Sequence, residues 1–125
     1  QAASNLERIA DHAHRIAEIA SQKSYNLPES LKEELSHMDD QICTLIDDSI
    51  TNLIQTNSNK ANELIDRIGD IKKSTGGIAR SSDSNDKSEL LVRLILASSL
   101  ERMLDYIRNI GELTINLSHA TRSEE

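Results

Sequence analysis

The chain of 125 residues contains no tryptophan and no phenylalanine, and aromatic side chains make up only 2% of it. Its core must therefore be built from Leu, Ile and Ala, which suits the packing of helix on helix and argues against a large β-sandwich. The length matches one domain with a modest core. We therefore expect a single all-α domain over residues 1–125.

The sequence also lacks a second cysteine, a long apolar run and an excess of positive charge. Cys43 is the only cysteine, so no intrachain disulfide can form, and we expect a buried structural thiol in a cytoplasmic protein. The most apolar stretch, residues 90–97, is interrupted by Arg93 and is far shorter than the roughly 20 residues of a membrane span. The net charge of −7, with no basic cluster in the sequence, argues against direct contact with nucleic acid.

Apolar residues recur with a helical period in four segments. Their expected bounds are residues 1 to about 23, 28 to about 55, 60 to 75, and about 87 to 119. Pro28 suits the first position of the second helix, and the polar run 56–59 suits a tight connection with a helix cap. Gly76 and Gly77 are expected to stop the third helix, with an exposed loop over 81–86. This pattern predicts an antiparallel four-helix bundle, unless one helix packs against an absent partner.

An internal repeat relates the first and fourth segments. Residues 4–11 (SNLERIAD) align with 98–105 (SSLERMLD), an offset of 94 residues that also pairs Glu18 with Glu112. Both segments place carboxylates on one helix face beside an apolar stripe. We therefore expect 1–24 to be the last helix of an upstream repeat and 28–119 to be a complete three-helix repeat. The start at Gln1, without an initiator methionine, fits a chain whose upstream part is missing.

The run LERIADHAHRIAE over residues 6–18 resembles the signature of PhoU-type phosphate-uptake regulators. In that family a Glu-x-x-x-Asp pair recurs once in each of two three-helix repeats, on the third helix. The resemblance covers essentially the whole chain, although bulky Leu104 stands where the family has a small residue. A looser similarity relates residues 66–70 to the acidic stretch on the middle helix of a repeat.

The resemblance implies that the acidic pairs hold metal, because the family is known for multinuclear clusters of iron, zinc or related metals on such carboxylates. Carboxylates four residues apart on a helix can bridge hard or borderline cations. The ligands expected from the resemblance are Glu7, Asp11, Asp66, Asp70, Glu101 and Asp105. The alternative is a set of ordinary solvated helix faces, with Glu–Arg pairs worth about 0.2–0.5 kcal/mol each.

By resemblance, the protein would restrain phosphate uptake by contacting the ATPase of a phosphate transporter or a phosphate-sensing kinase. We expect no enzyme activity, because Gly76-Gly77 is followed by Ile-Ala-Arg rather than a phosphate-binding sequence, and no nucleophile motif is present. An exposed apolar helix face would favour a homodimer. The four histidines, His12, His14, His37 and His119, are expected at the surface.

Three alternatives stay open at this point. The first is a carboxylate-bridged metalloenzyme that uses His14 together with the two Glu-x-x-x-Asp pairs inside the bundle. The second is a cytosolic bundle appended to a membrane phosphate transporter. The third is the regulatory half of a protein whose N-terminal part binds DNA.

Overall fold

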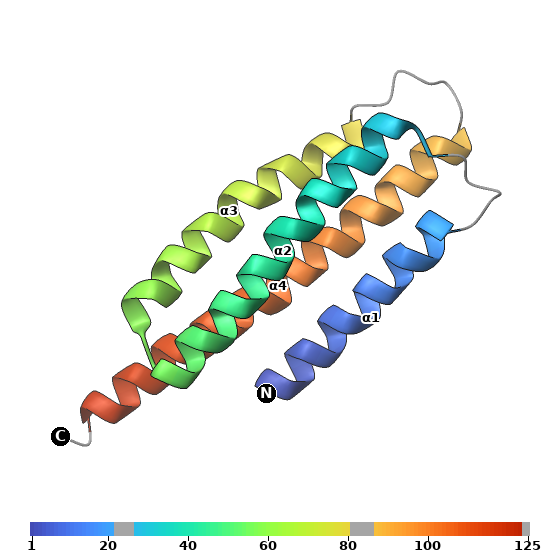
Figure 1. The fold of residues 1–125 in the computed structure, drawn as a ribbon. Helices are drawn as coiled ribbons and strands as arrows, with labels where there is room; N and C mark the ends of the chain where they lie inside the picture. Colours follow the sequence, from blue (N-terminus) through green and yellow to red (C-terminus); the bar gives the residue numbers. More distant parts are fainter. Residues whose placement is uncertain (22–26, 81–86, 124–125) are drawn as a thin grey trace.

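The computed structural model describes residues 1–21, 27–80 and 87–123, and within these ranges it contains four helices and no strand (Figure 1). The helices are α1 (Ala2–Ser21), α2 (Glu29–Gln55), α3 (Ser58–Arg80) and α4 (Lys87–Ser123). Successive helices run in opposite directions (Figure 1). The predicted all-α, antiparallel bundle is therefore confirmed.

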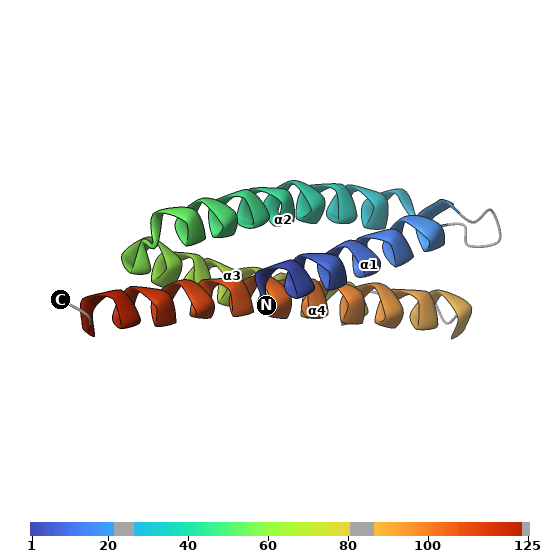
Figure 2. The ribbon, with the colours of Figure 1, turned by 90° about the horizontal axis from the view of Figure 1, so that it is seen from below.

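The longest helix, α4, is the centre of the arrangement. It packs against each of the other three helices, and α2 and α3 also pack against each other. The backbone of α1 approaches closely only that of α4, along which it runs antiparallel (Figure 1 and Figure 2). The bundle thus consists of a three-helix unit, α2–α4, with α1 attached to one of its helices.

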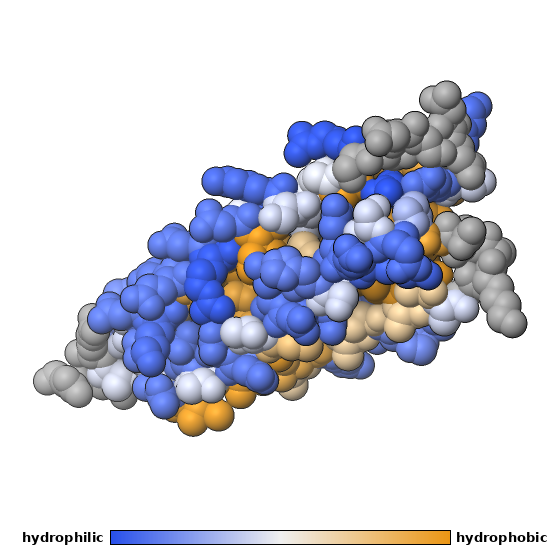
Figure 3. Space-filling model, turned by 45° about the horizontal axis from the view of Figure 1, so that its top comes forward, coloured by the Kyte–Doolittle hydropathy of each residue, from blue (hydrophilic) through white to orange (hydrophobic). Residues whose placement is uncertain are grey.

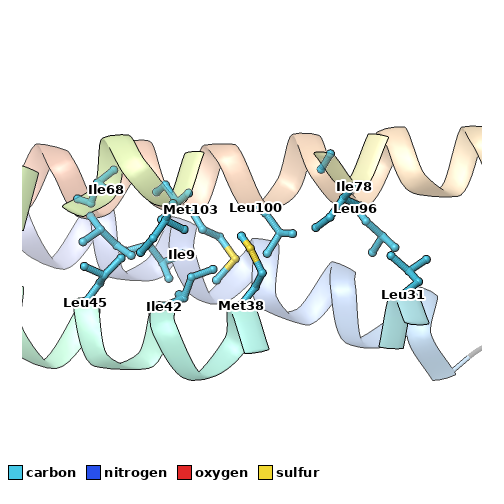
Figure 4. Packing of buried hydrophobic residues seen from close by; sticks show 14 of the residues in the cluster. Ile9, Leu31, Met38, Ile42, Leu45, Ile68, Ile78, Leu96, Leu100 and Met103 are labelled. Carbon is cyan, nitrogen blue, oxygen red and sulfur yellow. The ribbon is translucent and has the colours of Figure 1, made fainter. Parts of the chain in front are cut away.

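The core is a continuous cluster of aliphatic and methionine side chains. Ile9 of α1, Met38 and Ile42 of α2, and Met103 of α4 lie in this cluster (Figure 4). Among the described residues, five leucine and isoleucine side chains are completely inaccessible to solvent: Leu45, Leu96, Leu104, Ile107 and Ile110. Full burial of one such side chain contributes about 1.5–3 kcal/mol, so α4, which supplies four of them, organises the core.

The connection between α2 and α3 is as tight as the polar run predicts. Thr56 adopts the left-handed conformation with φ of 51° and caps α2, its amide donating to the carbonyls of Asn52 and Leu53. The side-chain oxygen of Asn57 accepts a hydrogen bond from the Lys60 amide at 3.1 Å, which satisfies a free donor at the start of α3. α2 begins at Glu29 with Pro28 as its cap, one residue later than predicted.

The prediction that Gly76 and Gly77 stop the third helix is wrong, because α3 continues to Arg80. Each glycine costs a helix about 1 kcal/mol relative to alanine, but tertiary contacts hold the last turn. Ile78 is buried in the core, and the guanidinium of Arg93 in α4 donates to the Ile78 carbonyl at 3.2 Å. The fourth helix also runs beyond its predicted end, to Ser123. The predicted loop over 81–86 lies outside the described residues, as does the predicted end of the first helix.

Several apolar side chains lie at the surface rather than in the core. Leu91 and Leu94 of α4 are 59% and 55% exposed. On the face drawn in Figure 3, apolar residues reach the surface between polar ones. Cys43 is exposed as well, so the predicted buried thiol is wrong. It follows the buried Ile42 by one position, and a rotation of about 100° per residue carries it off the core face.

Candidate functional site

The candidate site residues on α1 and α4 are all on the surface of the bundle. Glu7, Asp11, Glu101 and Asp105 are exposed, as expected for acids that flank the apolar stripe. Asp105 forms an ion pair with Lys72 of α3. The hydroxyl of Thr75, also on α3, lies 3.4 Å from Oε1 of Glu101. The acidic pair of α4 therefore faces α3.

The acidic residues predicted on α3 are also exposed. Asp66 and Asp70 line a surface hollow of about 460 Å³ together with Lys72, Lys73 and Arg108. Nζ of Lys73 lies 3.9 Å from Oδ1 of Asp70. Basic side chains therefore accompany these carboxylates and partly neutralise them.

A complete metal site is not present within the described residues. In that part of the chain, no three His, Cys, Asp or Glu side chains come close enough together to hold one ion. Protein sites for zinc use about four ligands, and calcium uses six or more. The acidic pairs would therefore need further ligands from outside the described residues to hold a metal ion.

Three of the four histidines lie at the surface, as predicted. His14, His37 and His119 are exposed. Nε2 of His14 lies 2.9 Å from Oε1 of Glu18, and both side chains are in solvent. His12 differs, because it is half-buried between α1 and α4. The prediction of a surface position for His12 is therefore wrong.

His12 belongs to a contact between α1 and α4 that we call the α1–α4 seam, formed by Asn5, Arg8, His12, Tyr106 and Asn109. The rings of His12 and Tyr106 stack with centroids 5.9 Å apart. The guanidinium carbon of Arg8 lies 5.7 Å from the centre of the Tyr106 ring, a cation–π contact. Asn109 donates a hydrogen bond of 3.4 Å to the side-chain oxygen of Asn5. The seam joins residues about 100 positions apart, which explains why no local pattern predicts it.

The seam brings the two copies of the repeat together. His12 and Tyr106 are equivalent positions of the repeat, 94 residues apart, and they stack directly on each other. Ile9 and Met103 are likewise equivalent, and both are buried in the core. When a residue contacts its own equivalent across two antiparallel helices, an approximate two-fold axis relates the helices. The structure therefore places the two motifs on neighbouring, antiparallel helices, but only the α4 motif also contacts α3.

The seam favours the neutral form of His12. Its Nδ1 is buried, and no described group forms a hydrogen bond with it. Burial lowers the pKa of His12, the positive charges of Arg15 and Arg102 lower it further, and Asp11 acts in the opposite direction.

None of the helices in the described ranges combines the length and the hydrophobicity that crossing a lipid bilayer requires.

The chain is similar to a known protein over most of its length. The chain is 28% identical over 119 residues to the phosphate-specific transport system accessory protein PhoU homolog of Clostridium acetobutylicum. The match covers 90% of this chain and 54% of that protein, so the chain spans about half the length of the curated relative. No family model matches the chain, and no solved structure matches it significantly. The chain is thus similar to a PhoU homolog over most of its own length.

Proposed function

We propose that this chain is part of a cytoplasmic regulator of phosphate transport that acts by binding a protein partner rather than by catalysis. The similarity to the PhoU homolog over 90% of the chain carries the proposal. The position of the two motifs supports it, since Glu7–Asp11 and Glu101–Asp105 occupy equivalent exposed positions on either side of the α1–α4 seam. The proposed partner is the ATPase of a phosphate transporter or a phosphate-sensing kinase.

The proposal includes two repeats, with residues 1–24 as the last helix of one and 28–119 as the other. A comparison of equivalent faces supports this division. On α4, Leu104, Ile107, Gly111 and Thr114 are buried in the three-helix unit, whereas their equivalents on α1 are exposed alanines. These alanines are Ala10, Ala13, Ala17 and Ala20. A helix that closes a second three-helix unit would present such a face to it.

The proposal also includes metal binding, for which the acidic pairs need further ligands from residues beyond those described. On α1, Glu7 and Asp11 lie one turn apart and form no ion pair with any described residue, so their two negative charges repel each other. A bound iron, zinc or other divalent ion would relieve their repulsion. Elemental analysis of the full-length protein, purified without chelator, is expected to find metal that is lost after changing both residues to alanine. An equal metal content in the two proteins would contradict this assignment.

The metalloenzyme alternative receives no support from the geometry. A carboxylate-bridged redox centre inside a bundle needs acidic side chains that point into the core. Glu7, Asp11, Glu101 and Asp105 are exposed instead, and His14 is paired with Glu18 in solvent.

A genetic measurement tests the proposed function. In a strain that depends on the full-length gene for phosphate repression, a reporter of phosphate starvation is read at high phosphate. We expect the double variant Glu7→Lys, Asp11→Lys to lose repression, because charge reversal changes the surface offered to a partner or a metal. The matched control, Glu29→Lys with Glu33→Lys, changes charge equally at two exposed residues four positions apart on α2. Equal repression in the two variants would contradict a role of Glu7 and Asp11 in the proposed regulation.

We also propose that the chain forms a homodimer, because Leu90, Leu91, Leu94 and Ile95 expose apolar surface on α4. Light scattering at moderate concentration is expected to give twice the mass of the chain. A monomer mass would overturn this assignment.

A further inference from the structure

Two adjoining hollows lie between α2 and α3, away from the Glu-x-x-x-Asp motifs of α1 and α4, and Asp70 of the acidic stretch on α3 lines one of them. The first has a volume of about 310 Å³ and is lined by Glu34 and Met38 of α2 and by Gly77 of α3, among others. The second has a volume of about 300 Å³ and includes Ile71 of α3. Gln41 lines both hollows, so they form one feature, which we call the α2–α3 groove.

The groove is apolar at its base. Met38, Ile71 and Ile78 line it and belong to the core cluster. It is open at Gly77 because that residue has no side chain, and a Cβ atom placed there would meet nothing within 4 Å. An apolar side chain from another molecule would therefore fill space that this chain leaves free, with a gain of roughly 25 cal/mol for each Å² of apolar surface removed from water.

The α2 side of the groove is strongly acidic. α2 contains seven Asp and Glu residues and a single basic residue, Lys32. Arg67 is the basic side chain lining the groove, and its guanidinium is already paired with Asp48 at 2.8 Å. Glu34 lines the first hollow and forms no ion pair with any described residue. Asp70 lines the second hollow, and its only ion pair within the described residues is a solvent-exposed one of 3.9 Å with Lys73. The groove thus combines an apolar base with an excess of negative charge along its lining and on α2.

We propose that the α2–α3 groove binds a basic amphipathic helix of a partner protein. Apolar side chains one or two turns apart on that helix enter the two hollows, and its Lys and Arg side chains pair with Glu34 and Asp70. A membrane surface or nucleic acid would be repelled by the charge of α2. The inference rests on the proposed function in that it specifies the chemistry of the protein partner.

A synthetic peptide tests the groove directly. The probe is a fluorescent helix of about 15 residues, a length at which isolated helices begin to be stable, with leucines on one face and lysines on the other. Fluorescence anisotropy measures its binding to the chain. A peptide of the same composition in scrambled order, which has no apolar face, serves as the peptide control. We expect saturable binding of the amphipathic peptide and much weaker binding of the scrambled one.

Matched variants locate the binding site. Gly77→Leu fills the first hollow and is expected to weaken binding by about tenfold or more, the size of a hot-spot loss. Gly69→Leu makes the same change on the same helix, also where a Cβ meets nothing within 4 Å, and is expected to leave binding unchanged. Glu34→Lys is expected to weaken binding more than Glu33→Lys, which changes net charge equally at an exposed residue outside the groove lining. Circular dichroism establishes that all four variants are folded.

Each remaining outcome is decisive. Equal weakening by both leucine variants would show that the first hollow is not the binding site, and equal weakening by both lysine variants would show that net charge alone attracts the peptide. Either result would overturn the groove. Equal binding of the scrambled peptide would do the same. Self-association that disappears in Gly77→Leu would assign the groove to a second copy of the chain instead. If Glu7→Lys, Asp11→Lys loses phosphate repression but the unchanged chain does not bind the peptide, the groove alone is refuted. If the chain binds the peptide but the variant keeps repression, the proposed function alone is refuted.

Discussion

Replacing Tyr106 with leucine should loosen α1 while leaving α2 and α3 unchanged. Tyr106 stacks on His12 and lies under the guanidinium of Arg8, and α1 packs closely only against α4. Leucine keeps apolar bulk and helix propensity at this position but removes the ring. An aromatic pair contributes about 0.5–1.5 kcal/mol beyond its burial, and an exposed cation–π contact contributes about 0.5–1 kcal/mol. The expected loss is therefore about 1–2.5 kcal/mol.

Amide hydrogen exchange measures this loss for each helix separately. Exchange in α1 should become about 5- to 60-fold faster, the factor that corresponds to this free energy. The exchange rates of amides in α2 and α3 should change little, because the three-helix unit keeps its core. Tyr106→Phe is the control, since it removes only the hydroxyl that accepts a 3.5 Å hydrogen bond from Arg8. An unchanged rate in α1, or an equal increase in all four helices, would refute the reasoning.

Three further predictions follow from single side chains. Leu104→Ala should lower the free energy of unfolding in urea by about 2–5 kcal/mol, because Leu104 is fully buried, whereas Leu91→Ala at an exposed position should change it by less than about 0.5 kcal/mol. His12 has a pKa lowered from its ordinary value of 6.5, mainly by burial. The stabilisation that comes from packing neutral His12 is therefore fully present above pH 6.5, and it is lost as the pH falls below 6.5 and through the lowered pKa of the folded state. The variant His12→Phe should lose less stability on acidification. Neighbouring atoms partly desolvate the thiol of the exposed Cys43, and this and the nearby charge of Asp39 raise the pKa of Cys43. Iodoacetamide should therefore alkylate it at pH 8 more slowly than an unstructured thiol, and faster in Asp39→Asn.

Each of these predictions has a contrary result. Equal destabilisation by the two leucine substitutions would mean that Leu104 is not in the core. An identical loss of stability between pH 7.5 and pH 5 in the His12→Phe variant would remove His12 as the cause. Alkylation of Cys43 at the rate of a free thiol would contradict the unfavourable surroundings of its thiolate.

Helix positions could be predicted from the sequence because each helix buries one stripe of aliphatic residues. Leu31, Met38 and Ile42 in α2 show this spacing, and all three are in the core. The period of 3.6 residues reports directly on which face is buried. Periodicity is less informative near the start of α4, where Leu90, Leu91 and Leu94 continue the apolar pattern but are exposed.

The wrong predictions have tertiary causes. Gly76 and Gly77 are poor helix residues, but packing of Ile78 and the hydrogen bond from Arg93 extend α3 past them. A lone cysteine favours burial on composition alone, yet the rotation of α2 sets Cys43 outside the core. Local propensity is a weak prior that such contacts override.

The candidate site could be predicted only as two separate motifs. The repeat identified α1 and α4 as equivalent helices, but nothing in the sequence indicates that they lie against each other. Their pairing buries His12 against Tyr106, its own equivalent position. The α2–α3 groove was missed for a similar reason, because it depends on Gly77 lying opposite Met38. A signal for the groove does exist in the sequence, namely the concentration of acidic residues in α2.

The rate of phosphate uptake by living cells tests the central claim most directly. Uptake of radiolabelled phosphate at high external phosphate is compared between a strain without the encoding gene, a strain with the gene restored, and a strain with the Glu7→Lys, Asp11→Lys version. A regulator that restrains phosphate transport predicts faster uptake without the gene, normal uptake after restoration, and faster uptake again with the altered motif. The same uptake rate in the presence and absence of the gene would contradict the proposed function.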